Sequence, residues 1–354
     1  MNIKHLGWCQ FHSHHKKQNL VLDNNNVARV AAQYKNAYTI YVEEATVQAT
    51  LSGKLFYELE GNFPAVGDWV TTNIQDGHYQ ITSILPRKNK FSRKAAGSKI
   101  KEQIVAANLD KVFVVMGLDY DLNLRRLERF VALIYESDCE PIIILNKSDV
   151  CLHAQKVIEG LHDTYPNISI LATSATENQG ITELKQHISE GITVAFVGSS
   201  GVGKSSLVNA LLQEDVQKVQ QVRKFRDRGQ HTTTNREMFL LPNGGLLIDT
   251  PGIRELQLWS SSESIDQSFG EIESLSKQCF FRNCTHQNEP QCAIIEAIEQ
   301  GQLDKKRLAS YYKLQREVQY FEKSDDHKTK RDKKKRHKQL SKMIRKKMKL
   351  KYRD

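Results

Sequence analysis

The chain has 354 residues, enough for two or three domains with separate cores, and 39% of them are hydrophobic, which excludes a mainly disordered protein. Residues 1–19 are rich in His, Lys and Gln and lack the apolar run of a secretory signal. No later apolar run approaches the ~18 residues that cross a membrane. We therefore expect a cytoplasmic protein with no membrane partner.

The excess positive charge lies in one segment. The formal net charge is +10 and the isoelectric point is near 9.1. Residues 328–353 hold fifteen of the 51 Lys and Arg residues and one acid, Asp332, so the rest of the chain has more acids than bases. This composition is typical of an arm that binds RNA phosphates, with an affinity that falls as salt rises. A charged tail that is merely solvated is the alternative.

Residues 27–88 have the pattern of a small β-barrel. Five short runs of alternating or β-branched residues are separated by Gly, Asp and Asn. The pattern predicts a barrel of the OB type, a fold that often binds nucleic acid, although a barrel that only packs against its neighbour is the alternative. Residues 1–26 form an N-terminal extension, in which His12, His14 and His15 suit a solvated, flexible terminus better than a metal site.

Residues 89–262 alternate between strands and helices. A basic connector, residues 86–99, precedes the alternation and is either an ordered linker or a phosphate-contacting loop. Apolar strand patterns then occur at 112–116, 141–145, 168–173, 192–197 and 245–249. This alternation predicts a parallel sheet with helices on both faces, and ligands bind such sheets at the carboxyl ends of the strands.

A glycine-rich loop follows one of these strands and precedes a helical pattern. From Gly198 to Ser205 it has the Gly-x-x-x-x-Gly-Lys-Ser spacing of a P-loop. In P-loops the backbone N–H groups surround the phosphates, the lysine binds the β- and γ-phosphates and the serine hydroxyl ligates Mg²⁺. The expected contacts are Gly198, Ser199, Ser200, Gly201, Val202, Gly203, Lys204, Ser205 and Ser206, with Lys204 catalytic and Ser205 on magnesium.

Two motifs at other strand ends select the base. Asn-Lys-Ser-Asp ends at Asp149, whose carboxylate can accept from the ring N–H and the exocyclic amine of guanine. Adenine offers this carboxylate no matching donors. The presence of Asp149 therefore argues against the interpretation of this chain as an ATPase or small-molecule kinase. Ser174 and Ala175 end the next strand, where backbone N–H groups can reach the guanine carbonyl. The expected base contacts are Asn146, Lys147, Ser148, Asp149, Ser174 and Ala175.

Two segments after the P-loop have the residues of nucleotide switches. Asp249 and Gly252 belong to Asp-Thr-Pro-Gly, where the aspartate can hold Mg²⁺ through water and the glycine N–H can contact the γ-phosphate. The polar stretch 226–234 lies between the P-loop and Asp249. Its Thr233 is the candidate that ligates Mg²⁺ only when GTP is bound.

The order of these motifs is rearranged. Ras-like GTPases run from the P-loop through the switch threonine and Asp-x-x-Gly to Asn-Lys-x-Asp and Ser-Ala, but here the last two come first. A circular permutation keeps the packed sheet and moves the termini. Because the chain leaves the nucleotide domain soon after Gly252, we expect switch movements to reach the C-terminal domain directly.

Three cysteines and a histidine lie within residues 279–292. Three thiolates and one imidazole match a closed, structural zinc site, and free thiols beside a chance histidine are the alternative. The expected zinc ligands are Cys279, Cys284, His286 and Cys292. The fold predicted is a multidomain chain with an OB-type β-barrel, a circularly permuted α/β P-loop GTPase domain and a mainly helical zinc-binding domain. The predicted boundaries are 1–26, 27–88, 89–262, 263–326 and the basic RNA-binding tail 327–354.

With these features the chain resembles the bacterial ribosome small-subunit-dependent GTPase A family. The similarity runs from about Ala28 to Tyr320 and includes FPAVGDWV, AANLDKVFVVM, RGQHTTT and DTPGIRE. The resemblance implies a GTPase that acts late in maturation of the small (30S) ribosomal subunit, binds its rRNA and leaves after GTP hydrolysis. It also implies one structural zinc ion, and Mg²⁺ accompanies GTP. We expect a monomer whose basic tail and His-rich start lie outside the shared pattern.

One position affects the mechanism. Ras-like proteins carry a water-orienting Gln after Asp-x-x-Gly, whereas this chain has Ile253. We expect slow hydrolysis that small subunits stimulate, with His231 as the candidate that orients water and a packing role as its alternative. Two other functions remain open. One is a GTPase in another RNA or large-subunit assembly step, and the other is a GTP-binding RNA adaptor with little hydrolysis.

Overall fold

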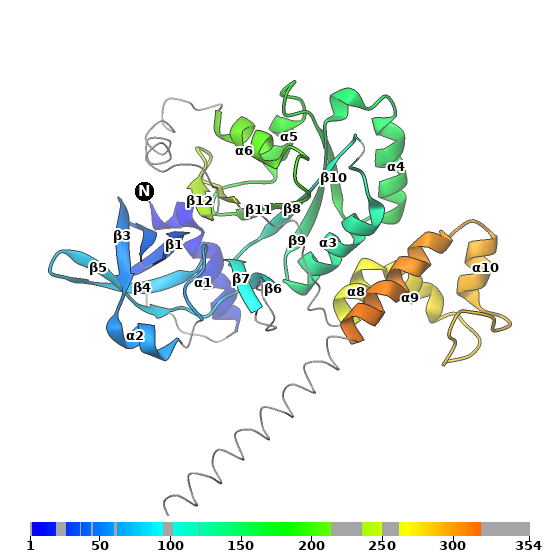
Figure 1. The fold of residues 1–354 in the computed structure, drawn as a ribbon, viewed down its shortest axis with the longest axis horizontal. Coiled ribbons are helices and arrows are strands. Elements are labelled where there is room, and N and C mark those ends of the chain that lie inside the picture. The colour runs from blue at the N-terminus through cyan, green and yellow to red at the C-terminus, as the bar shows by residue number, and fades with distance from the viewer. Residues whose placement is uncertain are drawn as a thin grey trace, which may run out of the picture. The chain divides into compact units, whose positions relative to one another are not determined.

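The computed structural model describes residues 2–18, 26–35, 37–43, 45–59, 62–94, 102–119, 121–213, 236–249 and 262–319 (Figure 1). The chain divides into two compact units, Met1–Gln257 and Leu258–Asp354. Each unit is described by itself. In the described ranges, every helix is too short or too polar to cross a membrane.

The first unit contains a closed five-stranded β-barrel. Its strands are β1 (Val27–Gln33), β2 (Tyr38–Val42), β3 (Ala45–Leu51), β4 (Trp69–Gln75) and β5 (His78–Ile84). They pair in the order β1-β2-β3-β5-β4, and β4 pairs back to β1, which closes the barrel. Val30, Ile40, Val70 and Ile81 fill its interior, and the short helix α2 (Gly53–Glu58) packs beside them through Leu55. The predicted barrel is confirmed.

The remainder of this unit is an α/β part with a parallel sheet in the order β10-β9-β8-β11-β13, with β12 antiparallel at its end. The strands are β8 (Lys111–Gly117), β9 (Glu140–Asn146), β10 (Ser169–Thr173), β11 (Thr193–Val197), β12 (Glu237–Leu240) and β13 (Leu246–Asp249). Each parallel strand coincides with an apolar run of the sequence. Both faces of β8 are buried, as a continuous apolar strand in a covered sheet requires.

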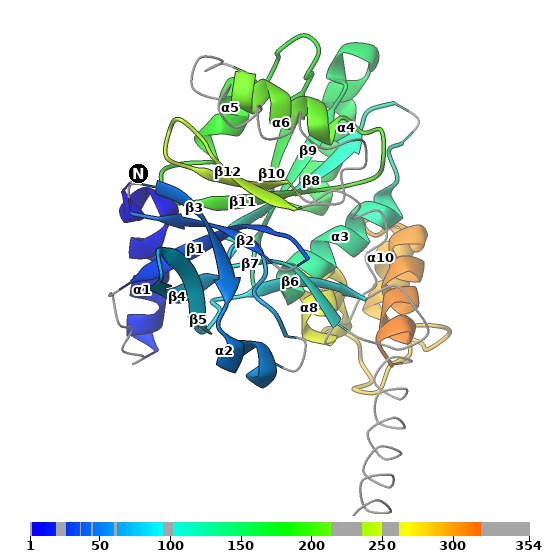
Figure 2. The ribbon, with the colours of Figure 1, turned by 60° about the vertical axis from the view of Figure 1, so that its left-hand side comes forward.

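Helices cover both faces of the sheet (Figure 2). They are α3 (Leu124–Glu136), α4 (Ala154–Thr164), α5 (Ile181–Gln186) and α6 (Lys204–Gln213). On one face, Leu184 of α5 and Leu207 of α6 pack with Phe113 and Val115 of β8. Helix α3 lies on the opposite face and buries Leu127 and five further apolar side chains, Phe130, Val131, Ala132, Leu133 and Ile134.

The barrel and the sheet are joined in one eleven-stranded sheet, because β1 pairs with β12 at Ala32 and Glu237. The Tyr41 hydroxyl of the barrel also donates to the Met238 carbonyl of β12 at 2.7 Å. Strand β6 (Lys90–Lys94), within the basic connector, pairs antiparallel with β7 (Glu102–Ala107). The connector was predicted only as a linker or a phosphate-contacting loop.

The N-terminal segment is ordered and packs on the barrel. It forms a 3₁₀ turn, η1 (Ile3–Leu6), and helix α1 (Trp8–Lys17). The prediction of a solvated, flexible terminus is therefore wrong for residues 2–18. The physical reason is a face of apolar and aromatic side chains at helical spacing: Trp8 and Phe11 pack on Trp69 of β4, with ring centroids 4.8 and 5.7 Å apart, and His15 is buried beside Phe11.

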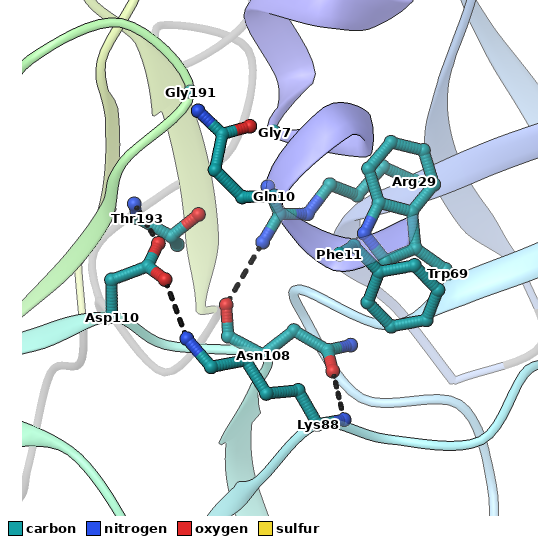
Figure 3. A pocket seen from close by; sticks show the side chains of 10 residues that line it. All are labelled: Gly7, Gln10, Phe11, Arg29, Trp69, Lys88, Asn108, Asp110, Gly191 and Thr193. Atoms are coloured by element: carbon teal, nitrogen blue, oxygen red, sulfur yellow. Dashed lines mark hydrogen bonds and ion pairs between the residues drawn. The ribbon is translucent and has the colours of Figure 1, made fainter. Parts of the chain in front are cut away.

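A buried arginine connects this segment with the barrel and the α/β part (Figure 3). The Arg29 guanidinium donates to the carbonyl oxygens of Leu6, Gly67 at 3.3 Å and Asn108 at 3.1 Å, and it lies 5.3 Å from the centre of the Trp69 ring. Burial lowers the pKa of Arg29 to about 10, against the opposite effect of two nearby carboxylates. Three carbonyl acceptors from three segments make this residue an anchor between them.

Beside Arg29, the start of β8 is held by a second set of bonds. Lys88 Nζ binds Asp110 Oδ1 at 2.7 Å, and Asp110 Oδ2 accepts from the Thr193 backbone N–H at 2.8 Å. On the side of α1, Gln10 donates to the Glu190 carbonyl at 3.3 Å. Hydrogen bonds and ion pairs thus join the three parts of the first unit: the N-terminal segment, the barrel and the part with the parallel sheet.

The second unit is helical in its described part. It contains α8 (Ser262–Ser268), α9 (Gly270–Ser276), α10 (Ala293–Glu299) and a helix over 305–319. Phe269 is fully buried, and the Arg307 guanidinium lies 4.4 Å from the centre of its ring. Arg307 Nε also donates to Glu271 Oε1 at 2.5 Å, which joins α9 to the helix 305–319. The basic tail, 327–354, lies outside the described residues.

Candidate functional site

The carboxyl ends of the parallel strands meet at one edge of the sheet. Asn146, the last residue of β9, is level with Gly117 of β8 and Thr173 of β10. Strand β11 pairs with β8 up to Val197 and leads directly into the glycine-rich loop at Gly198. Motifs that are far apart in the sequence therefore lie side by side, at the edge where open α/β sheets bind their ligands.

Two glycines of the loop are required by close backbone contacts. Gly198 has φ +146°, and a Cβ there would lie 2.3 Å from the Val115 carbonyl oxygen of β8. Gly203 has φ +96°, and its Cβ would lie 2.2 Å from Asn146 Nδ2. Any other residue at either position would push the loop away from the sheet. The loop is thus fixed against the strand ends by its own sequence.

Lys204 is the first residue of α6, directly after this loop. Its Nζ donates to the carbonyl oxygens of Gly198 at 2.8 Å and Ser199 at 2.5 Å, so the ammonium group lies within the curve of the loop. Ser205 follows with an exposed side chain. A helix N-terminus, a lysine and loop N–H groups together form a site for phosphate groups.

Asn146 links the ends of β9 and β10 to the glycine-rich loop. This side chain is almost fully buried, and its Nδ2 donates to the Val202 carbonyl at 2.8 Å. Its Oδ1 accepts from the Thr173 hydroxyl at 3.1 Å and from the Ala175 N–H at 3.3 Å. One asparagine therefore holds three motifs in a fixed arrangement, while Ser174 beside Ala175 is buried.

Lys147 has a left-handed backbone, φ +64°, and directs its side chain along the edge. Lys147 Nζ binds Asp119 Oδ2 at 2.6 Å, and this hydrogen bond holds the pKa of Asp119 below its usual range. Ser148 and Asp149 follow in a short 3₁₀ turn, η2 (Ser148–Val150), with the Asp149 carboxylate exposed. An exposed carboxylate held on a rigid turn is available to a ligand with two N–H donors.

The remaining site residues are only partly within the described ranges. Asp249 ends β13 on the same side of the sheet, opposite Glu237 of β12, and is half-buried. Gly252, Thr233 and His231 lie outside the described residues.

The cysteine cluster of the second unit is assembled from the end of α9, a loop and the start of α10. His286 Nδ1 lies 3.5 Å from both Cys279 Sγ and Cys292 Sγ, which are 3.9 Å apart. With Cys284, the four ligand atoms all lie within 4.8 Å of one another and could hold a metal ion. Within the loop, hydrogen bonds from Thr285 and its neighbours lower the pKa of Glu289 to about 2.

The structure adds three residues to the nucleotide edge: Asp119, Asp121 and Arg126. They belong to the turn between β8 and α3 and to the first turn of that helix. The sequence analysis named no residue there, although the segment directly follows the carboxyl end of a strand. That position was the available signal, because polar residues at strand ends of such sheets lie at the ligand edge.

Comparison with known proteins gives concordant matches. The family model described as RsgA GTPase matches residues 84–259. The "Small ribosomal subunit biogenesis GTPase RsgA" of Methanosarcina acetivorans is 42% identical over 320 residues, which cover 90% of this chain and 86% of that protein. A protein of Vibrio parahaemolyticus, named "Small ribosomal subunit biogenesis GTPase RsgA 2", is 42% identical and covers 89% of this chain and 85% of its own.

Solved structures agree with the fold. YjeQ from Thermotoga maritima is 28% identical, with a TM-score of 0.63 over 83% of this chain and 98% of that one. YloQ, described as a circularly permuted GTPase, is 22% identical, with a TM-score of 0.61 over 84% of this chain and 98% of that one. The barrel, the permuted motif order and relatives 42% identical over nine-tenths of the chain together show that this chain belongs to the RsgA GTPase family.

Proposed function

We propose that this protein is a GTPase that assists late maturation of the small (30S) ribosomal subunit, binds its rRNA and is released on GTP hydrolysis. The observation that carries the proposal is the joining of P-loop and guanine motif by Asn146 at one sheet edge. The printed names of the relatives supply the partner, because they describe small ribosomal subunit biogenesis. This partner also suits the basic composition of the tail 327–354.

The nucleotide contacts that we propose follow the geometry of the edge. The P-loop from Gly198 to Ser206 surrounds the phosphates, and Lys204 binds the β- and γ-phosphates. Asp149 reads the guanine N–H groups, beside Ser174 and Ala175. Ser205 and Thr233 are the ligands proposed for Mg²⁺. Asp249 is proposed to hold Mg²⁺ through a water molecule, and the Gly252 N–H to contact the γ-phosphate.

Hydrolysis is proposed to be slow in the free protein and faster on the small subunit. Ile253 has no group that can orient water, which supports a low intrinsic rate. His231 is the side chain proposed to orient the attacking water. The measurement is GTP turnover of His231→Ala with saturating small subunits, and an unchanged rate would remove this role.

The cysteine cluster is proposed to hold one structural Zn²⁺. Cys279, His286 and Cys292 have ligand-atom separations of 3.5–3.9 Å, and Cys284 Sγ lies within 4.8 Å of all three. These separations suit a single tetrahedral ion, since Zn–S bonds are about 2.3 Å and Zn–N bonds about 2.0–2.1 Å. Four protein ligands leave no open position for catalysis. Cys279, Cys284, His286 and Cys292 would thus connect the start of α10 to the end of α9.

We propose that the protein is cytoplasmic and monomeric. Its proposed domains are the N-terminal extension to residue 26, the barrel 27–88, the GTPase domain 89–262, the zinc-binding domain 263–326 and the tail. The permuted order supports a coupling in which the Gly252 region passes switch movements to the zinc-binding domain.

GTP hydrolysis measured with small subunits, with large subunits and without ribosomes tests this function. We expect stimulation by small subunits. Stimulation by large subunits alone would overturn the assignment in favour of another assembly step. A rate that no subunit changes, with GTP still bound, would indicate a GTP-binding RNA adaptor instead.

A further inference from the structure

Arg126 is fixed beside the P-loop by the sheet. It lies in the first turn of α3, where the cap residue Asn123 accepts from its backbone N–H at 3.1 Å. Helix α3 follows β8, and β8 pairs with β11, the strand that leads into the loop. Strand pairing therefore places the start of α3 next to the glycine-rich loop.

Arg126 and Lys204 meet at the same P-loop residue. Arg126 Nη1 donates to the Ser199 hydroxyl and, at 2.7 Å, to Asp121 Oδ1. Lys204 Nζ donates to the Ser199 carbonyl oxygen at 2.5 Å. Because a P-loop lysine binds the β- and γ-phosphates, Arg126 lies at the phosphate end of the site.

The Arg126 guanidinium has donors left for a ligand. Its two hydrogen bonds use Nη1 alone, so Nε and Nη2 have no partner within the described ranges. The side chain is 36% exposed, and the Asp121 carboxylate orients it. An arginine held in this way can bind an anion at the loop without first being ordered.

A cation at this place accelerates GTP hydrolysis. Water oxygen bonds to the γ-phosphorus, the bond to the β–γ bridging oxygen breaks, GDP leaves with that electron pair, and the water proton passes to a phosphate oxygen. Charge grows on the bridging oxygen and on the γ-phosphoryl group, where an arginine supplied by the same chain stabilises it in other GTPases. Because Ile253 cannot orient water, this charge stabilisation accounts for a larger share of the rate acceleration.

We infer that Arg126 binds the polyphosphate of GTP and stabilises the charge of the hydrolysis transition state. The inference rests on the proposed GTP hydrolysis and assigns a further residue to it. It differs from a purely structural role, in which Arg126 would only hold Ser199 and the loop in place.

The test compares Arg126→Ala and Arg126→Lys with Arg125→Ala, an exposed neighbour on the same helix. Three quantities are measured for the full chain: single-turnover GTP hydrolysis, affinity for GDP, and affinity for a GTP analogue that is not hydrolysed. We expect Arg126→Ala to slow hydrolysis by about tenfold or more, within the large effects known for arginines in this role. GDP affinity should change far less than analogue affinity, Arg126→Lys should restore the rate only in part, and Arg125→Ala should behave as wild type.

Two results would overturn the inference. One is an Arg126→Ala rate equal to that of the wild type. The other is an equal loss of GDP and analogue affinity together with a lower melting temperature, which would indicate loop support only. If the wild-type protein hydrolysed no GTP, the proposed function would fail separately, and the ratio of analogue to GDP affinity would still decide whether Arg126 binds the γ-phosphate.

Discussion

Two regions of the first unit are built in opposite ways. One is the nucleotide edge, where the carboxyl ends of the parallel strands meet the glycine-rich loop, and the other is the N-terminal junction, where α1 packs on the barrel around Trp69 and Arg29. At the edge, Lys204, Asp149 and Arg126 are exposed or half-buried, and polar bonds join Lys204 and Arg126 to the glycine-rich loop. At the junction, Trp69 and Arg29 are almost fully buried among aromatic rings and backbone carbonyls.

The difference separates ligand binding from stability. Groups at the edge are partly exposed to solvent and contribute little to the stability of the fold. Their substitution should therefore change ligand binding more than folding. Groups at the junction are buried, and their removal leaves a cavity or unpaired carbonyls. The following substitutions test this separation.

The largest effect is expected at the junction. Trp69→Ala removes a fully buried ring that contacts Trp8, Phe11 and Arg29, and large aromatic-to-alanine changes in cores cost about 3–5 kcal/mol. Denaturant unfolding of the wild type and the variant measures this. Ile74→Ala, 63% exposed on the same strand, is the control and should change stability little. An unchanged midpoint for Trp69→Ala would contradict the anchoring role of the N-terminal helix.

The next effect is expected at the phosphate end of the nucleotide edge. Lys204→Ala should lower GTP turnover by about 10²–10³-fold, the effect of losing one charge-stabilising donor, while the melting temperature stays near that of the wild type. Lys156→Ala, exposed on α4, is the matched control. A Lys204→Ala protein that unfolds early would show that the edge also supports the fold.

The smallest effect is expected at Asp119. Its ion pair with Lys147 is partly exposed, and pairs of this kind contribute about 0–1 kcal/mol. Asp119→Asn should therefore weaken guanine nucleotide binding by less than about fivefold at neutral pH. Because Lys147 lowers the pKa of Asp119, its contribution is present above the ordinary carboxyl pKa and is lost as pH falls through the lowered value. Titration of nucleotide affinity against pH for both proteins checks this, and a difference that persists below that range would contradict it.

The sequence predicts the sheet well because its strands are continuous apolar runs. The apolar runs 112–116 and 141–145 lie within β8 and β9, the run 192–197 begins one residue before β11, and the motifs follow these strands directly. Because the carboxyl ends of parallel strands meet at one edge of the sheet, a polar tetrapeptide or a glycine-rich loop that directly follows such a strand lies at that edge. The placement of this edge is therefore largely a local property of the sequence.

The junction depends on contacts that no local pattern contains. Trp8, Phe11 and His15 have the spacing of one helix face, but their partner Trp69 is more than fifty residues away, and the His-rich composition suggested a solvated segment. Strand β6 was hidden for a similar reason, since its basic residues leave no apolar alternation. Arg126 was missed because its role appears only when Ser199 is placed beside it.

Base recognition by Asp149 is the central claim about the edge, and one measurement tests it most directly. The affinities of Asp149→Asn for guanine and xanthine nucleotides are compared with those of the wild type. Asparagine presents an N–H where xanthine has its additional carbonyl, so the preference should shift from guanine towards xanthine with the fold unchanged. Guanine selectivity equal to that of the wild type would contradict the account.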